Sequence, residues 1–275
     1  MKEQLEEIIR QVYFKEKRNL FTFLTGAGIS SDSGIPTYRG TDGIWVRGTK
    51  FHKPEEFGTL KYFKQHPEEV WQYALFRKKM FETAMPNQSH LELADIERML
   101  KDRFHLITQN IDNLHRRAGN EKLYEIHGNN REIKCSEGCK KIMPMPEEIR
   151  GKDIDENLTQ DDAALLTCPD CGHWMRPNIL WFDECYDEKT NKKFSSLKVA
   201  KNSGVLFIIG TSGATNLPLA ITETALKYGA CIVDINIEDN HFTELIKNKK
   251  NKLIIREKST EVLALIKEII KNLTR

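Results

Sequence analysis

The sequence predicts an α/β fold in which a doubly wound parallel sheet carries two insertions. Short, nearly continuous apolar runs recur along the chain, helix-like segments separate them, and two stretches interrupt this alternation. Apolar runs of this kind are typical of parallel strands that are buried on both faces, because helices then cover each side of the sheet. We therefore expect one large sheet with a smaller module and a helical insertion attached to it.

The composition is that of a globular protein. Of the 275 residues, 39% are hydrophobic and 30% are charged, which argues against both a disordered chain and a membrane protein. Lys and Arg number 42 against 40 Asp and Glu, so net charge gives no reason to expect a nucleic acid as a partner. The first residues do not resemble a signal peptide, and no run approaches the ~18 apolar residues of a membrane span. We expect a cytoplasmic protein without a membrane partner.

Apolar runs and apolar periodicity give the elements in order. Six runs are predicted as strands: 21–25, 104–109, 123–127, 205–210, 231–235 and 253–255. Apolar positions three and four residues apart predict the helices between them. The first predicted helix contains Leu5 to Tyr13, and the last contains Val262 to Leu273 and packs against the sheet. Three helices between them are predicted to begin at Pro67, at a capping box of Ser89 and Glu92, and near Asn216.

Two stretches without a sustained apolar period are interpreted as insertions at strand ends, where sites are often built. The first includes residues 41–66, which are polar and rich in aromatic side chains, and the second includes 129–185, which hold four of the six cysteines. This division gives a large domain of 1–40, 86–130 and 186–275, a helical insertion of 41–85 and a small module of 131–185.

A glycine-rich turn follows the first strand. Gly26-Ala27-Gly28-Ile29-Ser30 stands where a dinucleotide-binding, Rossmann-like domain cradles a phosphate, although Ser31 replaces the third glycine of that fingerprint. A tight strand-to-helix connection that needs positive φ would explain the glycines equally well. Just beyond the turn, Arg39 could bind a phosphate and Tyr38 could wall a ligand ring, unless Arg39 is simply a surface arginine.

Polar side chains also follow the next two strands. Gln109, Asn110 and Asp112 come directly after the second strand, at the carboxyl edge where open α/β sheets bind ligands. Asn110 and Asp112 together offer the donor and acceptor that a carboxamide needs, although either could instead cap a helix. His127 ends the third predicted strand at the same edge and is the best candidate for a general base, the alternative being a structural histidine.

Four cysteines form two close pairs. Three residues separate Cys135 from Cys139, two separate Cys168 from Cys171, and 28 residues lie between the pairs. Four thiolates in this arrangement fit a tetrahedral structural zinc ion that leaves no position for a substrate. A disulfide is uncommon in a reducing compartment. A redox-active pair of cysteines would work alone and would not require a second pair of cysteines. The other two cysteines are expected to be buried structural thiols.

Several segments occur together in a fixed order: Gly26–Ser30, Gly34–Pro36, Arg39-Gly40, Thr108–Asp112, Leu114–Gly119, His127-Gly128, the four cysteines, Trp181-Phe182 and Gly210–Ser212. None is specific alone, but their ordered combination resembles the sirtuin family of NAD-dependent deacylases. The resemblance covers nearly the whole chain.

The resemblance implies that the chain uses NAD as a co-substrate and removes acyl groups from lysine. The implied NAD site consists of Gly26, Ala27, Gly28, Ile35, Tyr38, Arg39, Gln109, Asn110, Ile111, Asp112, Gly210, Thr211, Ser212 and Asn236. His127, Asn110 and Asp112 would be catalytic. Trp181 and Phe182 would bind an acylated protein or peptide as an added strand, and the four cysteines would hold the zinc.

The chemistry that the resemblance implies has two stages. The bond between nicotinamide and ribose breaks as the acyl-lysine carbonyl oxygen attacks the ribose carbon, and positioning must supply much of the acceleration because an amide oxygen is a weak nucleophile. His127 would then take a proton from a ribose hydroxyl, which attacks the former acyl carbon. The acyl group moves to ADP-ribose and free lysine leaves.

Two departures from the family bear on the substrate. Asp183 stands where the family usually has glycine, which adds a charge and restricts the backbone. Thr37-Tyr38 resembles a subgroup that removes acidic acyl groups such as succinyl, and Arg77 matches the arginine of that subgroup. Ala74 falls on its tyrosine, but Tyr73 lies four residues before Arg77 and could face the same side of a helix. We expect only a weak preference for acidic acyl groups.

Two other functions use the same residues. The NAD pocket could serve ADP-ribosyl transfer or simple NAD hydrolysis, or the chain could be a zinc-containing NAD sensor without turnover. His127 favours deacylation, because simple cleavage needs a base less and a sensor needs none.

Overall fold

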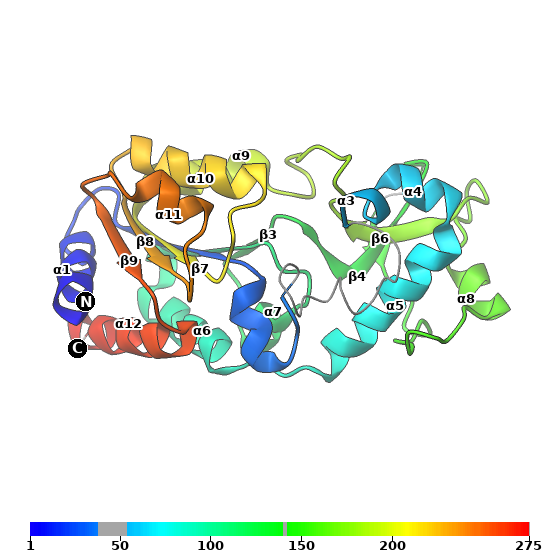
Figure 1. The fold of residues 1–275 in the computed structure, drawn as a ribbon, viewed down its shortest axis with the longest axis horizontal. Helices are drawn as coiled ribbons and strands as arrows, with labels where there is room; N and C mark the ends of the chain where they lie inside the picture. Colours follow the sequence, from blue (N-terminus) through cyan, green and yellow to red (C-terminus); the bar gives the residue numbers. More distant parts are fainter. Residues whose placement is uncertain (38–53, 140–141, 275) are drawn as a thin grey trace.

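The computed structural model describes residues 1–37, 54–139 and 142–274. A large lobe is built on a six-stranded sheet, and a small lobe is built on a three-stranded sheet (Figure 1). Tyr38 and Arg39, both assigned to the implied NAD site, lie outside the described residues. None of the described helices combines the length and the apolar character needed to cross a bilayer.

The large sheet is parallel throughout, with the order β3-β2-β1-β7-β8-β9. Its strands are β1 (Leu20–Thr25), β2 (Phe104–Thr108), β3 (Leu123–Glu125), β7 (Ser203–Ile209), β8 (Cys231–Ile235) and β9 (Lys252–Ile255). Each predicted apolar run is therefore a strand, and the doubly wound fold is confirmed. The chain runs outward in opposite directions from the central pair β1 and β7, and such a reversal leaves a crevice at the carboxyl ends of the two strands.

Helices cover both faces of this sheet (Figure 1). One layer contains α1 (Lys2–Tyr13), α6 (Gln88–Leu100) and α12 (Ser259–Leu273), and the other contains α9 (Lys193–Asn202), α10 (Asn216–Lys227) and α11 (His241–Ile246). Between the layers, the ring of Phe23 on β1 stacks on Phe104 of β2 and Phe207 of β7, with centroids 5.2 and 4.8 Å apart. Short connections complete the lobe: η1 (Ala27–Ser33), η2 (Lys101–Arg103) and α7 (Leu114–Ala118).

The predicted capping box of α6 is wrong. Asn87 is the N-cap, and its Oδ1 accepts a hydrogen bond from the Ser89 N–H at 2.9 Å. The His90 ring, not a glutamate, faces the Asn87 N–H, with Nδ1 3.3 Å away. Glu92 instead forms an ion pair with Lys267 of α12, so the acidic residue joins two helices and leaves the cap to a neutral side chain.

The small lobe combines both insertions. It contains α3 (Pro54–Phe57), α4 (Leu60–Gln65), α5 (Pro67–Thr83), β4 (Gly128–Cys135), β5 (Met143–Pro144), α8 (Gln160–Leu165) and β6 (Met175–Ile179), with the antiparallel order β5-β4-β6. Trp71 of α5 is fully buried, and its Nε1 donates to the Met175 oxygen at 2.7 Å. The same apolar cluster contains Cys135 and Cys168, so the helical insertion and the cysteine module share one core. The proposed domain boundaries stay a prediction.

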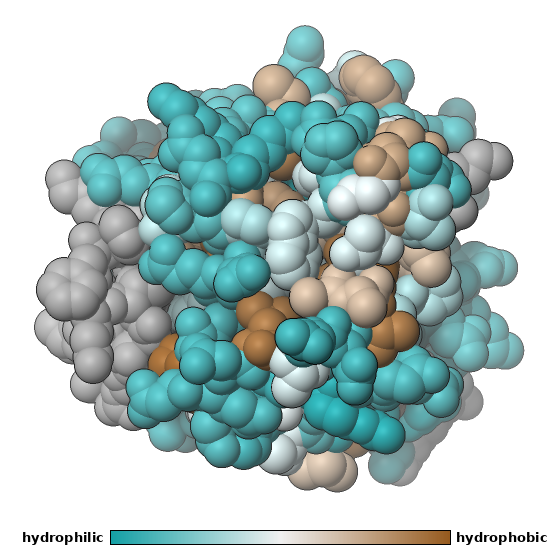
Figure 2. Space-filling view, turned by 90° about the vertical axis from the view of Figure 1, so that its right-hand side faces the viewer, coloured by the Kyte–Doolittle hydropathy of each residue, from teal (hydrophilic) through white to brown (hydrophobic). Residues whose placement is uncertain are grey.

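The end of the small lobe is mostly hydrophilic. Seen from that end, polar side chains cover most of the surface and a few hydrophobic ones show near its middle (Figure 2). The lobe has its buried apolar side chains in the shared core.

Candidate active site

A cavity of about 1360 Å³ lies at the carboxyl ends of the central strands and reaches the small lobe. Every predicted binding or catalytic residue of the described ranges lines it: Gly26, Ala27, Gly28, Ile35, Gln109, Asn110, Ile111, Asp112, His127, Trp181, Phe182, Gly210, Thr211, Ser212 and Asn236. Pockets for one small ligand usually measure ~300–1,000 Å³. The cavity therefore has room for two ligands side by side.

The glycine turn is required by close packing. The Gly28 N–H donates to the Gly210 oxygen at 2.8 Å, and a Cβ on Gly28 would lie only 2.8 Å from the Gly210 Cα. Gly26 has a φ of −127°, so this glycine does not need the left-handed region. The alternative based on positive φ is therefore wrong for Gly26; glycine lets the turn after β1 approach the end of β7.

Asn110 and Asp112 meet at a serine of that turn. The Ser30 hydroxyl donates to Asp112 Oδ2 at 2.7 Å and accepts from Asn110 Nδ2 at 3.2 Å. Asp112 Oδ1 also accepts from the Leu114 N–H at the start of α7 at 2.9 Å, although the N-cap of that helix is Asn113. Burial raises the pKa of Asp112. Ser30 could not be assigned a role from the sequence, because only the fold brings the turn to the end of β2.

Two buried histidines lie behind Ser30 and had no predicted role. His90 Nε2 is 3.5 Å from the Ser30 hydroxyl, and its ring meets His115 edge-on with centroids 4.8 Å apart. His115 Nε2 in turn lies 3.0 Å from the Thr25 hydroxyl on β1. Burial lowers the pKa of His90 to about 4 and that of His115 well below 6.5, so both rings are neutral near pH 7. They stabilise the Ser30 region without carrying charge.

His127 occupies the connection between the two sheets. The prediction that it ends a strand is wrong: β3 ends at Glu125, and the His127 oxygen accepts from the Leu180 N–H of the small lobe at 2.9 Å. Burial lowers the pKa of His127 to about 4, and a hydrogen bond to the Gln109 main chain opposes that shift. The ring is thus neutral near pH 7, as a general base must be. Its Nε2 lies 2.9 Å from the Tyr186 hydroxyl, a residue that sequence analysis missed.

The predicted peptide segment forms a turn in this structure. The Phe182 N–H donates to the Gly58 oxygen at 2.9 Å, and Asp183 accepts from the N–H groups of Leu60 and Lys61 at 2.8 and 3.1 Å. The carboxylate thereby ties the turn to the first residues of α4, and Asp183 has no positive φ that would strain it. Trp181 is buried beside Arg176, and the guanidinium carbon of Arg176 lies 4.4 Å from the centroid of the Trp181 ring.

The four paired cysteines meet in the small lobe. Their Sγ atoms all lie within 4.8 Å of one another, with separations of 3.2 to 3.6 Å between the closest pairs. Zinc–sulfur bonds of about 2.3 Å place tetrahedral sulfurs about 3.8 Å apart, so the donor set fits zinc. None of the four lines the large cavity, which makes the zinc structural. It is the only cluster of potential metal ligands among the described residues.

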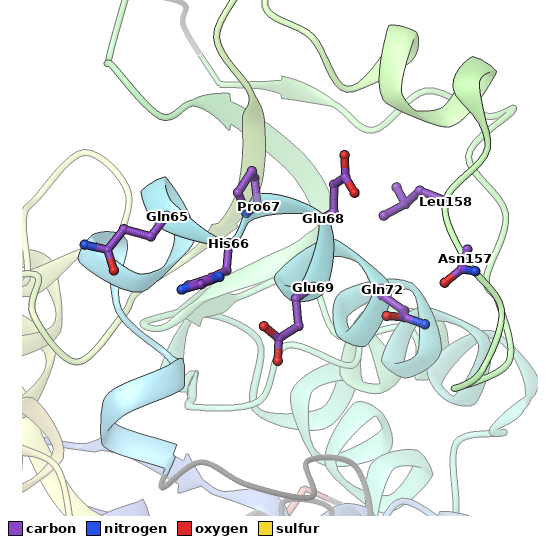
Figure 3. A pocket seen from close by; sticks show the side chains of 8 residues that line it. All are labelled: Gln65, His66, Pro67, Glu68, Glu69, Gln72, Asn157 and Leu158. Atoms are coloured by element: carbon purple, nitrogen blue, oxygen red, sulfur yellow. The ribbon is translucent and has the colours of Figure 1, made fainter.

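A second cavity, of about 550 Å³, lies where α4 meets α5 on the small lobe. Its lining includes Glu68 and Glu69, whose carboxylates point away from each other (Figure 3). Glu69 already accepts from the Tyr62 hydroxyl at 2.8 Å. The acidic groups do not converge on one point, so the arrangement does not specify a ligand.

Comparison with known proteins identifies the family. Residues 26–216 match the model of the Sir2 family. The chain belongs to the Sir2 family. An NAD-dependent protein deacylase of Leptospira interrogans serogroup Icterohaemorrhagiae serovar copenhageni is 37% identical over 263 residues, covering 94% of this chain and 96% of that protein. One of Pyrococcus furiosus is 35% identical over 261 residues, with the same coverage.

Solved structures agree with this assignment. A Sir2 homolog–NAD complex superposes with a TM-score of 0.79 at 26% identity, covering 98% of this chain and 95% of the other. A Sir2–p53 peptide–NAD⁺ complex superposes with a TM-score of 0.72 at 26% identity, covering 98% of each chain. The sirtuin resemblance of the sequence is therefore confirmed over almost the whole Sir2-family chain.

The buried histidines should make the stability of this Sir2-family protein depend on pH. His90 is neutral in the fold because burial lowers its pKa from 6.5 to about 4. Below pH 6.5 the unfolded chain binds a proton that the folded chain does not, so the free energy of unfolding falls by up to about 1.4 kcal/mol per pH unit for this group until the pH reaches its folded pKa. Denaturant titrations at several pH values in this range give the free energy of unfolding as a function of pH. This free energy should change less steeply with pH in His90→Asn than in the unmodified protein, and an equal pH dependence would contradict a neutral His90 in the fold.

Loss of one zinc ligand should weaken the small lobe. We expect Cys168→Ser to lower the bound zinc and the melting temperature, because Cys168 is both a ligand candidate and part of the shared core. Metal analysis and thermal unfolding with and without a chelator measure both effects. Cys185→Ser is the matched control, since Cys185 is exposed, contrary to expectation, and lies outside the cluster. Equal zinc content in both variants would rule out the site.

Proposed function

We propose that this Sir2-family chain is an NAD-dependent protein lysine deacylase that transfers the acyl group to ADP-ribose and releases nicotinamide. One observation carries the proposal: His127, a neutral base, lines the same cavity as the Asn110–Asp112 pair and the glycine turn. A sensor would need no base at this place. The names of the relatives, NAD-dependent protein deacylases, support the same activity.

The polar groups around Ser30 hold the nicotinamide end of NAD in this proposal. Asn110 Nδ2 donates to the Gly26 oxygen at 3.1 Å, which fixes the amide so that its oxygen can accept from a carboxamide. Asp112 is held from two sides and can receive a further donor only in the orientation that Ser30 and Leu114 impose. When bound, NAD supplies a ribose carbon that becomes electrophilic as nicotinamide leaves. The residues around it orient the acyl oxygen toward that carbon and exclude water.

His127 acts in the second stage. Its neutral imidazole accepts a proton that originates on a ribose hydroxyl, and the hydroxyl oxygen then attacks the acyl carbon. Ring orientation comes from the Gln109 main chain on one side and from the Leu180 N–H, which holds the His127 main chain, on the other. The base is thus fixed to both lobes, which is the arrangement needed when the two substrates enter from different lobes.

The acylated lysine would enter along the small-lobe side of the cavity, past Trp181 and Phe182. Phe182 is 43% exposed and Trp181 is buried, so one ring can contact a peptide while the other walls the cavity. The N–H groups of both residues already donate, to the Gly58 oxygen and to Glu184, so peptide pairing here would rely on main-chain carbonyls. Solved structures of Sir2 proteins with a p53 peptide support a peptide substrate.

Product analysis tests the proposal against its alternatives. Incubation with NAD and a mixed pool of acyl-lysine peptides should yield nicotinamide, free lysine peptide and acyl-ADP-ribose by mass spectrometry. His127→Ala should lower acyl transfer by about 10²–10⁴-fold while the melting temperature stays unchanged. Rapid NAD cleavage without any peptide would favour hydrolysis or ADP-ribosyl transfer, and NAD binding without turnover would favour a sensor.

Helix α5 brings two cationic residues to the cavity, Arg77 and Lys78, and Lys78 already forms an ion pair with Glu82. Arg77 lies over the rings of Tyr73 and Phe81 at 5.9 and 5.1 Å, and its Nε is buried without a hydrogen-bond partner among the described residues. We propose that this guanidinium gives acidic acyl chains an advantage. Arg77→Met should lower kcat/KM for succinyl-lysine peptides by about tenfold and leave the value for acetyl-lysine peptides within about twofold. An equal loss of kcat/KM on both peptides would show that Arg77 does not select acidic acyl chains.

A further inference from the structure

A tyrosine shares the cavity with the base of this site and contacts it. Tyr186 lies in the connection between β6 and α9, half-buried, and lines the same cavity as His127. Its hydroxyl oxygen is 2.9 Å from His127 Nε2, and the two ring centroids are 5.8 Å apart. A substrate hydroxyl that approaches Nε2 therefore meets an atom that already has the Tyr186 hydroxyl as its hydrogen-bond partner.

The direction of this hydrogen bond follows from the tautomer of His127. The Gln109 main chain offers the ring a carbonyl, which can only accept, so the imidazole must donate there. A neutral imidazole has a single N–H, and Nε2 is consequently left as the acceptor. Tyr186 donates its proton to Nε2, and its oxygen keeps lone pairs for other donors.

Thr215 lines the same cavity as Tyr186 and can donate to its oxygen. The Thr215 hydroxyl forms a hydrogen bond with Tyr186, and it also lies 3.2 Å from Gln109 Oε1. One hydroxyl proton cannot serve both partners, so the phenol oxygen can take a proton from elsewhere when Thr215 donates to Gln109. Burial raises the pKa of Tyr186, which keeps the phenol protonated near pH 7.

We propose that Tyr186 relays the proton from the substrate ribose hydroxyl to His127 in the acyl-transfer stage, an inference that rests on the proposed deacylase function. The ribose O–H bond breaks, its proton bonds to the Tyr186 oxygen, and the released electron pair forms the new bond to the acyl carbon. At the same time the original Tyr186 O–H bond breaks and that proton bonds to Nε2. Tyr186 ends as a neutral phenol and His127 as an imidazolium.

The relay requires the Tyr186 hydroxyl and not the ring alone. A phenylalanine at this place would pack beside His127 and line the cavity in the same way, but it could not pass a proton. The relay also lets His127 remain joined to Gln109 throughout, since only Nε2 changes its protonation. Nicotinamide release precedes proton transfer, so the first stage does not depend on the relay.

Removing the Tyr186 hydroxyl oxygen alone distinguishes nicotinamide release from acyl transfer. In Tyr186→Phe we expect the kcat of acyl transfer to fall by about 10²-fold, the order of a lost general-base contribution. Exchange of labelled nicotinamide into NAD in the presence of an acetyl-lysine peptide, which reports the first stage, should stay within about twofold. KM for the peptide should also stay within about twofold, because the hydroxyl does not bind the peptide.

Two further variants complete the design. Tyr124→Phe also removes a phenol hydroxyl, but Tyr124 packs on His105 outside the cavity and should leave both rates unchanged. The double variant His127→Ala with Tyr186→Phe should be no slower than His127→Ala alone, because a relay without its acceptor contributes nothing.

Three results would overturn the relay. Acyl transfer that is unchanged in Tyr186→Phe would show direct transfer to His127, and faster transfer would show that the phenol blocks the base. Parallel loss of acyl transfer and nicotinamide exchange would show a packing role only. If the unmodified protein forms no acyl-ADP-ribose, the proposed function itself fails, and this outcome is seen before any variant is made.

Discussion

The contact between Gly28 and Gly210 is the constraint on which the rest of the site depends. It joins the turn after β1 to the end of β7 at the point where the chain reverses its direction across the sheet. No side chain fits between the two backbones, so the distance between the two halves of the sheet is fixed at this point. The crevice beside it follows from topology, and the residues at the strand ends reach that crevice without any dedicated loop.

Around that contact, buried polar groups hold one another in place. Ser30 binds both Asn110 and Asp112, and the paired rings of His90 and His115 connect this group to β1. Ser30 gives the buried carboxylate of Asp112 a hydrogen-bond donor, so loss of this hydroxyl would be costly for its neighbour. Because the histidines are neutral, this support adds no charge next to the site where charge develops during the reaction.

The strands and the polar residues at their carboxyl ends could be predicted from the sequence, because they depend on apolar periodicity and on position along the chain. Apolar runs located the parallel strands, and the polar residues that follow β2 were found because every parallel strand ends at the same edge. The contacts between distant segments could not be read in this way: the meeting of His90 with His115, of Ser30 with Asp112, and of Tyr186 with His127 depends on how separate elements pack. The capping box failed for a related reason, since a tertiary ion pair uses the glutamate.

The shared core of the small lobe links two features that no motif connects. Helix α5 carries Trp71 into the apolar cluster that contains Cys135 and Cys168, and further along it carries Arg77 into the large cavity. Loss of a metal from the four cysteines would therefore weaken the core on which the helix that bears the guanidinium packs. The selectivity proposed for Arg77 would then depend on the four-cysteine site as well as on the residues that line the cavity.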